Sequence, residues 1–248
     1  MIGIVGGAGP LAGNDLFYKI IEETAALSDQ EHLPVLLWSD PTKIPDRTEF
    51  LEGKVKQNPA VPITEIFLKL ERNGARLGAI PCNTAHAPVI FEEIRTGLQK
   101  VGSQLQLISI IEETVRYLAQ QYPSGTPVGV LSTTGTWKRR IYADPLEAAG
   151  FEVLTPEAEE QSLVHQAIYH KGFGVKASGT QITGKAKEIL YGQADTLIDQ
   201  GAEVVILGCT EIPLVIREAF YRQKRMVDTV RVLARALIKA YAPDKLKH

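Results

Sequence analysis

The hydrophobic residues of this chain follow two alternating patterns. Short runs of mostly aliphatic residues are typical of strands that are buried on both faces. Between these runs, apolar residues recur every three or four positions, as they do in amphipathic helices. We expect strands at 2–5, 35–38, 77–80, 105–110, 128–131, 151–154 and 204–207. We expect helices over 16–27, 62–70, 89–98, 111–118, 157–170, 184–200 and 230–238, and one around 137–142 that breaks or restarts at Asp144-Pro145.

This alternation predicts an α/β protein with parallel sheets and helices on both faces. Part of the chain also repeats itself: residues 70–84 recur as 197–211, and residues 3–10 recur as 129–136. The two repeats have offsets of 127 and 126 positions. Because two independent segments give nearly one offset, we infer that an α/β unit has been duplicated.

The two cysteines of the chain, Cys82 and Cys209, occupy matching positions in this repeat, each directly after a strand. We therefore expect two similar Rossmann-like domains related by a pseudo-twofold axis, with the thiols facing each other across an interdomain cleft. Two thiols placed in this way can take a proton from one face of a carbon and return one to the other. The alternative is a pair of buried structural cysteines, since free cysteine is common in protein cores.

Composition restricts the possible partners. The chain has 248 residues, 44% of them hydrophobic and 23% charged, which suits a globular protein of two domains. Its net charge of −2 gives no positive field that would attract nucleic acid. No apolar stretch is long enough to span a membrane, and the first residues lack the features of a signal peptide. We therefore expect a cytoplasmic protein with reduced thiols.

Each cysteine stands between a strand and a helix, where backbone N–H groups and the helix dipole stabilise a thiolate. Asn83 and Thr84 follow the first cysteine, and Thr210 follows the second. These side chains can hold the α-carboxylate of a substrate, or they can serve as helix caps.

Two segments rich in glycine and proline, 39–61 and 172–184, interrupt the alternation of strands and helices. Such segments are candidates for substrate loops. Arg47 lies in the first and Lys176 in the second, and one cation from each half can clamp a second carboxylate of a substrate. From composition alone, solvated loop cations are the simpler interpretation.

Other kinds of site find weak support. Residues 7–12 match the dinucleotide fingerprint G-x-G-x-x-A, but Asp40 lies later than the acidic residue that this fingerprint requires, and Pro10 removes a backbone N–H. The histidines at 32, 86, 165, 170 and 248 show no metal-ligand spacing with the cysteines. No G-x-S-x-G elbow is present for serine hydrolysis. We expect no metal.

Several motifs, spread in order over almost the whole chain, resemble those of aspartate racemases, in the cofactor-independent aspartate/glutamate racemase superfamily. They are Gly6-Gly7-Ala8-Gly9-Pro10, Ile44-Pro45-Asp46-Arg47-Thr48, Pro81-Cys82-Asn83-Thr84-Ala85-His86, residues 131–136 with Tyr142, Ile168-Tyr169, Val175-Lys176-Ala177, Leu207-Gly208-Cys209-Thr210-Glu211-Ile212-Pro213 and Val227-Asp228-Thr229. The chain departs from the usual pattern at Ala8, where methionine is common, and at Ser178, where glycine is usual. These departures concern substrate choice and leave the candidate catalytic groups in place.

The resemblance implies two similar α/β domains, usually in a homodimer, with the active site between them. The first domain would hold residues 1–104, with 212–248 returning to it, and the second would hold 105–211. It implies Cys82 and Cys209 as acid–base thiols that work without a cofactor.

For the substrate, the resemblance assigns the α-carboxylate to Asn83 and Thr84, and the side-chain carboxylate to Arg47 and Lys176. We therefore expect a racemase that interconverts L- and D-aspartate. A racemase or isomerase of glutamate or another small acid, and a non-catalytic dicarboxylate-binding protein, are the alternatives.

Overall fold

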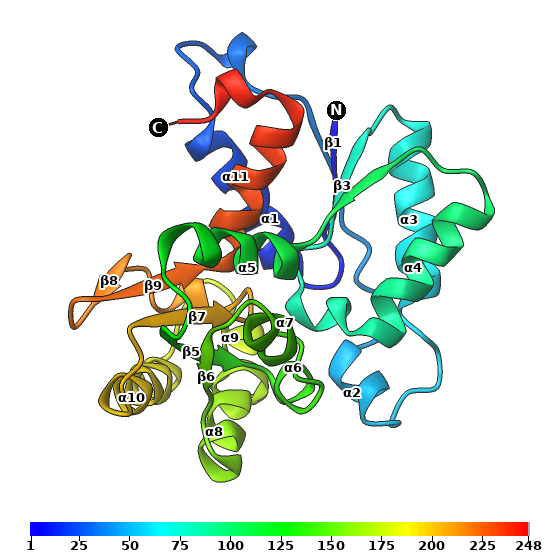
Figure 1. The fold of residues 1–248 in the computed structure, drawn as a ribbon. Coiled ribbons are helices and arrows are strands. Elements are labelled where there is room, and N and C mark those ends of the chain that lie inside the picture. Colours follow the sequence, from blue (N-terminus) through cyan, green and yellow to red (C-terminus); the bar gives the residue numbers. More distant parts are fainter. Residues whose placement is uncertain (248) are drawn as a thin grey trace. The chain divides into compact units, whose positions relative to one another are not determined.

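The computed structural model describes residues 1–247, and the chain divides into two compact units. Unit 1 comprises Met1–Glu113 together with the chain from Val230 onward, and unit 2 comprises Thr114–Thr229. Each unit is an α/β body built around its own sheet (Figure 1).

Unit 1 contains a four-stranded parallel sheet. Its order is β2 (Val35–Trp38), β1 (Ile2–Val5), β3 (Leu77–Ala79) and β4 (Gln106–Ile108). Its helices are α1 (Pro10–Glu23), α2 (Arg47–Leu51), α3 (Ala60–Arg72), α4 (Pro88–Lys100) and α11 (Thr229–Tyr241), with short 3₁₀ turns η1 (Asp29–Glu31), η2 (Asn83–His86) and η4 (Pro243–Lys245). In Figure 1, α1 and α11 lie on one side of β1 and β3, and α3 and α4 lie on the other.

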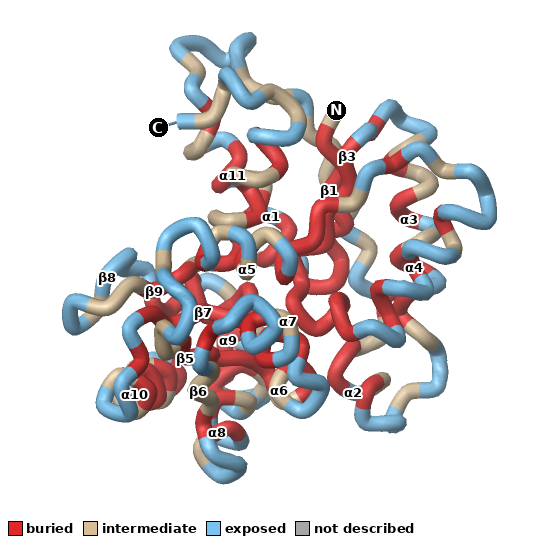
Figure 2. The backbone as a smooth tube through the Cα atoms, viewed as in Figure 1, coloured by how far each residue is buried: buried red, intermediate tan, exposed pale blue. Residues whose placement is uncertain are grey.

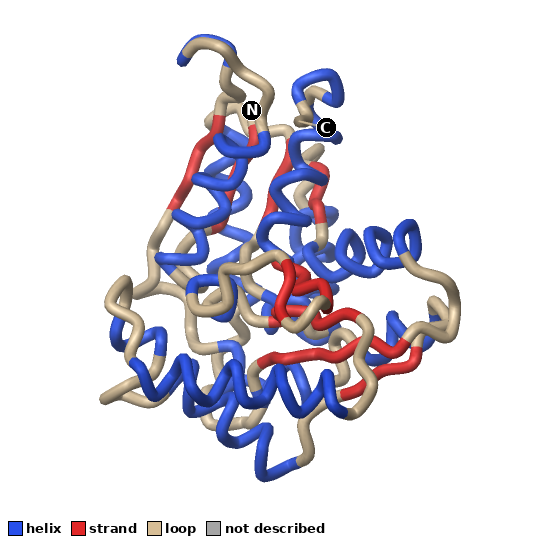
Figure 3. Tube along the Cα trace, turned by 90° about the vertical axis from the view of Figure 1, so that its left-hand side faces the viewer, coloured by secondary structure: helices blue, strands red, loops and turns tan. Residues whose placement is uncertain are grey.

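Unit 2 contains a five-stranded sheet. Its order is β6 (Glu152–Leu154), β5 (Pro127–Ser132), β7 (Val204–Gly208), β9 (Lys224–Asp228) and β8 (Phe220–Tyr221). Every pair is parallel except β8 with β9. The remaining elements are α5 (Ile110–Gln121), which begins at the end of unit 1, α6 (Thr134–Lys138), α7 (Ala143–Ala148), α8 (Ala158–Tyr169), α9 (Val175–Ser178), α10 (Gly184–Asp199) and the 3₁₀ turn η3 (Ile212–Leu214). Figure 3 shows the strands of each unit flanked by helices.

The two units share one internal arrangement. In unit 1 the first and third strands are neighbours, and in unit 2 the corresponding β5 and β7 are neighbours. A Cβ built on Gly3 of β1 would lie 3.0 Å from Ala75, and a Cβ built on Gly129 of β5 would lie 3.2 Å from Ala202. Both glycines therefore let the loop after a helix approach the strand closely. The duplicated α/β fold expected from the sequence is confirmed.

The central strands form the cores because they are buried on both faces. All four residues of β1 are buried, as are all five residues of β7 (Figure 2). In unit 2, Val205 and Leu207 of β7 pack in a cluster with Leu190 and Leu197 of α10. The carboxyl ends of these strands are consequently held in rigid surroundings.

The predicted strands and most of the predicted helices are present close to their expected positions. The helix expected over 16–27 instead spans Pro10–Glu23, and Leu27 lies beyond its end and is exposed. The helix expected around 137–142 is divided into α6 and α7, and the helix restarts at Ala143, directly before the expected Asp144-Pro145. The sequence patterns did not predict the β8–β9 pair. β8 has only two residues, and three of the five residues of β9 are charged, so neither strand gives a long apolar run.

The unit boundaries differ from the expected ones at 104/105 and 211/212. β4 pairs with β3, which places residues 106–108 in the first sheet. β9 pairs with β7, which places residues 224–228 in the second sheet. Backbone pairing therefore moves the boundaries to 113/114 and 229/230.

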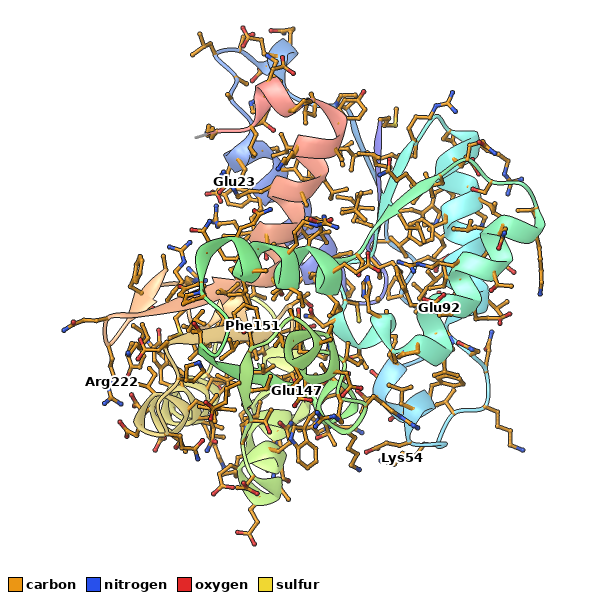
Figure 4. All side chains as sticks on the ribbon, in the orientation of Figure 1. Glu23, Lys54, Glu92, Glu147, Phe151 and Arg222 are labelled. Carbon is orange, nitrogen blue, oxygen red and sulfur yellow. The ribbon has the colours of Figure 1, made fainter. Side chains whose placement is uncertain are left out.

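Charged side chains fasten the peripheral elements within each unit. In unit 1, Glu23 of α1 accepts hydrogen bonds from Arg231 and Arg235 of α11. In unit 2, Arg222 of the β8–β9 turn forms ion pairs with Asp195 and Asp199 of α10. Glu23 and Arg222 are labelled in Figure 4.

Among residues 1–247, none of the helices combines the length and the apolar character needed to cross a bilayer. The same residues contain no group of three or more His, Cys, Asp or Glu side chains placed to bind a metal ion. His248 lies outside the described residues.

Candidate active site

Cys82 follows the third strand of unit 1 and occupies the N-cap position of η2. Its carbonyl oxygen accepts hydrogen bonds from the Ala85 N–H at 3.2 Å and from His86 Nδ1 at 2.9 Å. Burial lowers the pKa of His86 to about 4, so the ring is neutral at pH 7 and carries its proton on Nδ1. The ring also packs against Phe91 at a tilt of 35°, with centroids 4.3 Å apart. Hydrogen bonds within the η2 turn therefore fix the backbone that carries the Cys82 thiol.

The glycine turn after β1 allows the first predicted substrate loop to lie directly against the strand end. A Cβ on Gly7 would lie 2.7 to 2.8 Å from backbone atoms of Asp40, so only glycine fits there without a shift. β1 and β3 are adjacent in the sheet. The loop that begins near Asp40 therefore leaves from the same edge that carries Cys82.

Arg47 connects this loop to the glycine turn. It is the first residue of α2, whose N-cap Asp46 accepts a hydrogen bond from the Glu49 N–H at 3.0 Å. Its guanidinium group donates to the carbonyl oxygens of Pro45, at 3.1 Å, and of Ala8. Arg47 is buried, so the interpretation as a solvated loop cation is wrong. The fork-shaped guanidinium also suits the recognition of a carboxylate.

Asn83 and Thr84 form the first part of η2 and are both buried. η2 packs against α2. Unit 1 therefore brings Cys82, Asn83, Thr84 and the helix of Arg47 together at one edge of its sheet.

In unit 2, the corresponding edge is formed by β5 and β7, with Ser132 opposite Gly208. Thr133 caps α6 by accepting a hydrogen bond from the Thr136 N–H at 3.4 Å. A Cβ on Gly208 would lie 3.1 Å from Tyr142, so the glycine makes room for the aromatic ring directly before Cys209. Burial raises the pKa of Tyr142, and its hydroxyl is therefore neutral at physiological pH.

Cys209 is in direct contact with a carboxylate. Its Sγ donates to Oε2 of Glu211 at 3.0 Å, and the Thr210 hydroxyl donates to the same oxygen at 3.1 Å. The other oxygen, Oε1, accepts from Lys176 of α9. The structure thus brings Cys209, Thr210 and Lys176 together around the carboxylate of Glu211.

The surroundings in this cluster shift the pKa values of Glu211 and Cys209 in opposite directions. Burial alone would raise the pKa of Glu211, but the Lys176 charge and the hydrogen bonds from Cys209, Lys176 and Thr210 outweigh it and lower the pKa to about 2. Burial and the Glu211 charge raise the pKa of Cys209 well above its usual value, against a smaller opposing effect of Lys176. At neutral pH the cluster therefore contains a thiol, a carboxylate and an ammonium group.

The sequence reasoning did not assign a role to Glu211. The available signal was its place two residues after the cysteine, on the same tight turn. Lys176 was expected to bind a substrate carboxylate, and in the structure it is ion-paired with Glu211. The two residues are 35 positions apart, so no local pattern joins them.

The chain is thus an α/β protein of two similar units, each with a cysteine after the corresponding central strand. The family described as Asp/Glu/hydantoin racemase matches residues 5–237. The chain belongs to this family and is an amino-acid racemase.

The chain is similar to several individual proteins. Broad specificity amino-acid racemase RacX of Bacillus subtilis (strain 168) is 28% identical over 246 residues, which cover 97% of this chain and 98% of that protein. A glutamate racemase of Stutzerimonas stutzeri (strain A1501) is 30% identical over 178 residues, 70% of this chain and 61% of that protein. Among solved structures, Picrophilus torridus aspartate racemase superposes with a TM-score of 0.80 at 28% identity, covering 96% of this chain and 93% of that one. The family expected from the motifs is confirmed.

Proposed function

We propose that this protein interconverts L- and D-aspartate by transferring protons between two cysteines and the α-carbon, without pyridoxal phosphate. The observation that carries the proposal is the equivalent placement of the thiols. Cys82 follows β3 and Cys209 follows β7, and these are corresponding strands of the two units. Both thiols stand at the carboxyl ends of parallel strands, which is where ligands bind in sheets of this kind.

In the proposed reaction, the thiolate of one cysteine removes the α-proton and becomes a thiol. The thiol of the other cysteine gives its proton to the opposite face of the carbanion and becomes a thiolate. Charge and protons balance, and only the configuration of the carbon changes. The negative charge that develops on the substrate is stabilised by fixed dipoles and donors rather than by water.

Substrate binding follows from the neighbours of each thiol. We assign the α-carboxylate to Asn83 and Thr84, which are buried directly after Cys82, and to Thr210 beside Cys209. We assign the side-chain carboxylate to Arg47, with Lys176 as the second cation. The similarity to the aspartate racemase of Picrophilus torridus supports this choice.

One observation favours a second candidate, a racemase of wider substrate range. The charge of Lys176 is already balanced by Glu211. Lys176 therefore selects less strongly for a substrate that carries a second carboxylate. The similarity to broad specificity racemase RacX agrees with this possibility. The homodimer and the cytoplasmic location expected from the sequence complete the proposal.

Exchange of the α-hydrogen with deuterated water tests the proposal. The protein is incubated with single enantiomers of aspartate, glutamate and several neutral amino acids, and NMR records loss of the α-proton signal while chiral chromatography records racemisation. We expect exchange and racemisation with aspartate. Activity confined to glutamate or to neutral amino acids would overturn the substrate assignment. Ligand-dependent thermal stabilisation without any exchange would identify a binding protein instead.

A further inference from the structure

The contacts of Glu211 show that it does more than shape a turn. It is 4% exposed, and three polar side chains converge on its two carboxylate oxygens. One of these is the candidate catalytic thiol itself, whose Sγ lies 3.0 Å from Oε2. A buried carboxylate at this distance penalises the loss of the thiol proton, because a thiolate would place two negative charges side by side.

Other groups at this edge do not remove the penalty. The Lys176 ammonium contacts Oε1 and balances the carboxylate, but Cys209 donates to the opposite oxygen. The Tyr142 hydroxyl is neutral, and Asp228 ends the neighbouring strand β9, where it adds a further carboxyl group to this end of the sheet. The arrangement as a whole favours the protonated form of Cys209.

We propose that Glu211 is a positioning residue that keeps Cys209 protonated in the resting enzyme, so that Cys209 begins the reaction as the proton donor and Cys82 as the base. The inference rests on the proposed two-thiol function and adds an inequality between the thiols. After one turnover Cys209 is a thiolate beside Glu211, and Cys82 is a thiol. That form of the enzyme is higher in free energy than the resting form. Of the two enzyme–substrate complexes, the one whose enantiomer presents its α-proton to Cys82 is therefore the more populated.

This inequality has a kinetic signature. The equilibrium constant between two enantiomers is unity, so kcat/KM must be equal in the two directions for any variant. A difference in pKa between the two thiols can therefore appear only as a difference in kcat between the two directions that is matched by an equal ratio of the KM values. Glu211→Gln should reduce this difference by about tenfold for each unit by which the Cys209 pKa falls.

The direct experiment is a thiolate titration in a Cys82→Ser background. This variant leaves Cys209 as the only thiol of the chain, because the sequence has two cysteines. Ultraviolet thiolate absorbance is followed against pH, with the Cys82→Ser/Cys209→Ser protein subtracted as a blank for tyrosine ionisation. Adding Glu211→Gln should lower the midpoint by about one to three pH units. An unchanged midpoint would overturn the inference.

Three controls separate charge from loosening of the structure. Glu159→Gln, on the exposed surface of α8, removes a carboxylate elsewhere and should leave the midpoint unchanged. Lys176→Gln breaks the same ion pair but keeps the carboxylate, so the midpoint should stay high or rise. If Lys176→Gln lowered the midpoint as Glu211→Gln does, solvent entry rather than charge would be the cause. Glu211→Asp keeps the charge and should restore a raised midpoint.

A second measurement needs no change at Glu211. In the Cys82→Ser protein at neutral pH, infrared spectroscopy should show an S–H stretching band displaced to low frequency by a charged acceptor. Absence of the band would overturn the inference. Neither readout uses substrate. An active racemase with an unshifted midpoint would defeat the inference alone, whereas a shifted midpoint in a protein without α-hydrogen exchange would defeat the proposed function.

Discussion

His86 Nδ1 lies 2.9 Å from the carbonyl oxygen of Cys82, four residues earlier in the chain. The ring thereby holds the turn that presents a candidate catalytic thiol. Burial lowers the pKa of His86 to about 4, below its ordinary value of 6.5. The folded protein therefore favours a neutral ring, while the unfolded chain takes up a proton on acidification.

This relationship predicts an acid-sensitive component of stability. The contribution of a neutral, buried His86 is complete above pH 6.5, declines as the pH falls, and is lost on passing through about 4. Thermal melts between these two pH values should show a falling melting temperature. His86→Gln, which keeps a donor but does not titrate, should be less stable at pH 7 and lose less between pH 6.5 and 4.5. Equal slopes for both proteins in this range would contradict the assignment.

Gly7 should tolerate no side chain, because a Cβ would lie 2.7 Å from the backbone of Asp40. We expect Gly7→Ala to destabilise the fold by about 1–3 kcal/mol through displacement of the loop. Gly192, an exposed position of α10 with nothing within 4 Å of an added Cβ, is the matched control. There, alanine should stabilise the fold by about 0.5–1 kcal/mol. Denaturant unfolding measures the change in the free energy of unfolding for each variant, which should have opposite signs. Destabilisation by both substitutions would contradict the prediction.

Arg47 combines two functions in the proposed site, since its guanidinium group ties the loop to Ala8 and is assigned to bind the side-chain carboxylate of the substrate. We expect Arg47→Lys to raise KM for aspartate by about tenfold or more, because the loss of a charged hydrogen bond costs about 1.5–3 kcal/mol. KM for a neutral amino acid should change less. Lys43→Gln, in the same loop and on an exposed ion pair with Asp40, is the control. Equal effects on acidic and neutral substrates would assign Arg47 a structural role only.

The two cysteines should be individually indispensable. Cys82→Ser and Cys209→Ser keep the shape of the side chain but raise the pKa of the acid–base group far above the working range. We expect each to lower racemisation by at least about 10²-fold, the size of effect typical of a lost general acid or base. Chiral chromatography measures the rates, and circular dichroism confirms folding. Full activity in both single variants would exclude the two-thiol mechanism.

Much of the fold follows from local patterns. The three aliphatic residues of β1, Ile2, Ile4 and Val5, favour burial, and the glycine turn that follows ends the strand. The same reasoning located β7 and the cysteine after it. The β8–β9 pair escaped prediction because its turn, at Arg222 and Gln223, uses left-handed backbone without glycine, with φ of 46° and 63°. A turn of this kind gives no signal in the sequence.

The sequence by itself determined the duplicated α/β units and the place of each thiol after a buried strand. Apolar periodicity is carried by residues close together in the chain, and the repeat is found by comparing two such local segments. Only the tertiary structure decided that Glu211 contacts Cys209 and pairs with Lys176, and that Arg47 is bound to Ala8. These partners are brought together by loops whose course depends on sheet order and packing. The charge that each thiol experiences is therefore a property of the folded protein, and it cannot be derived from residue spacing.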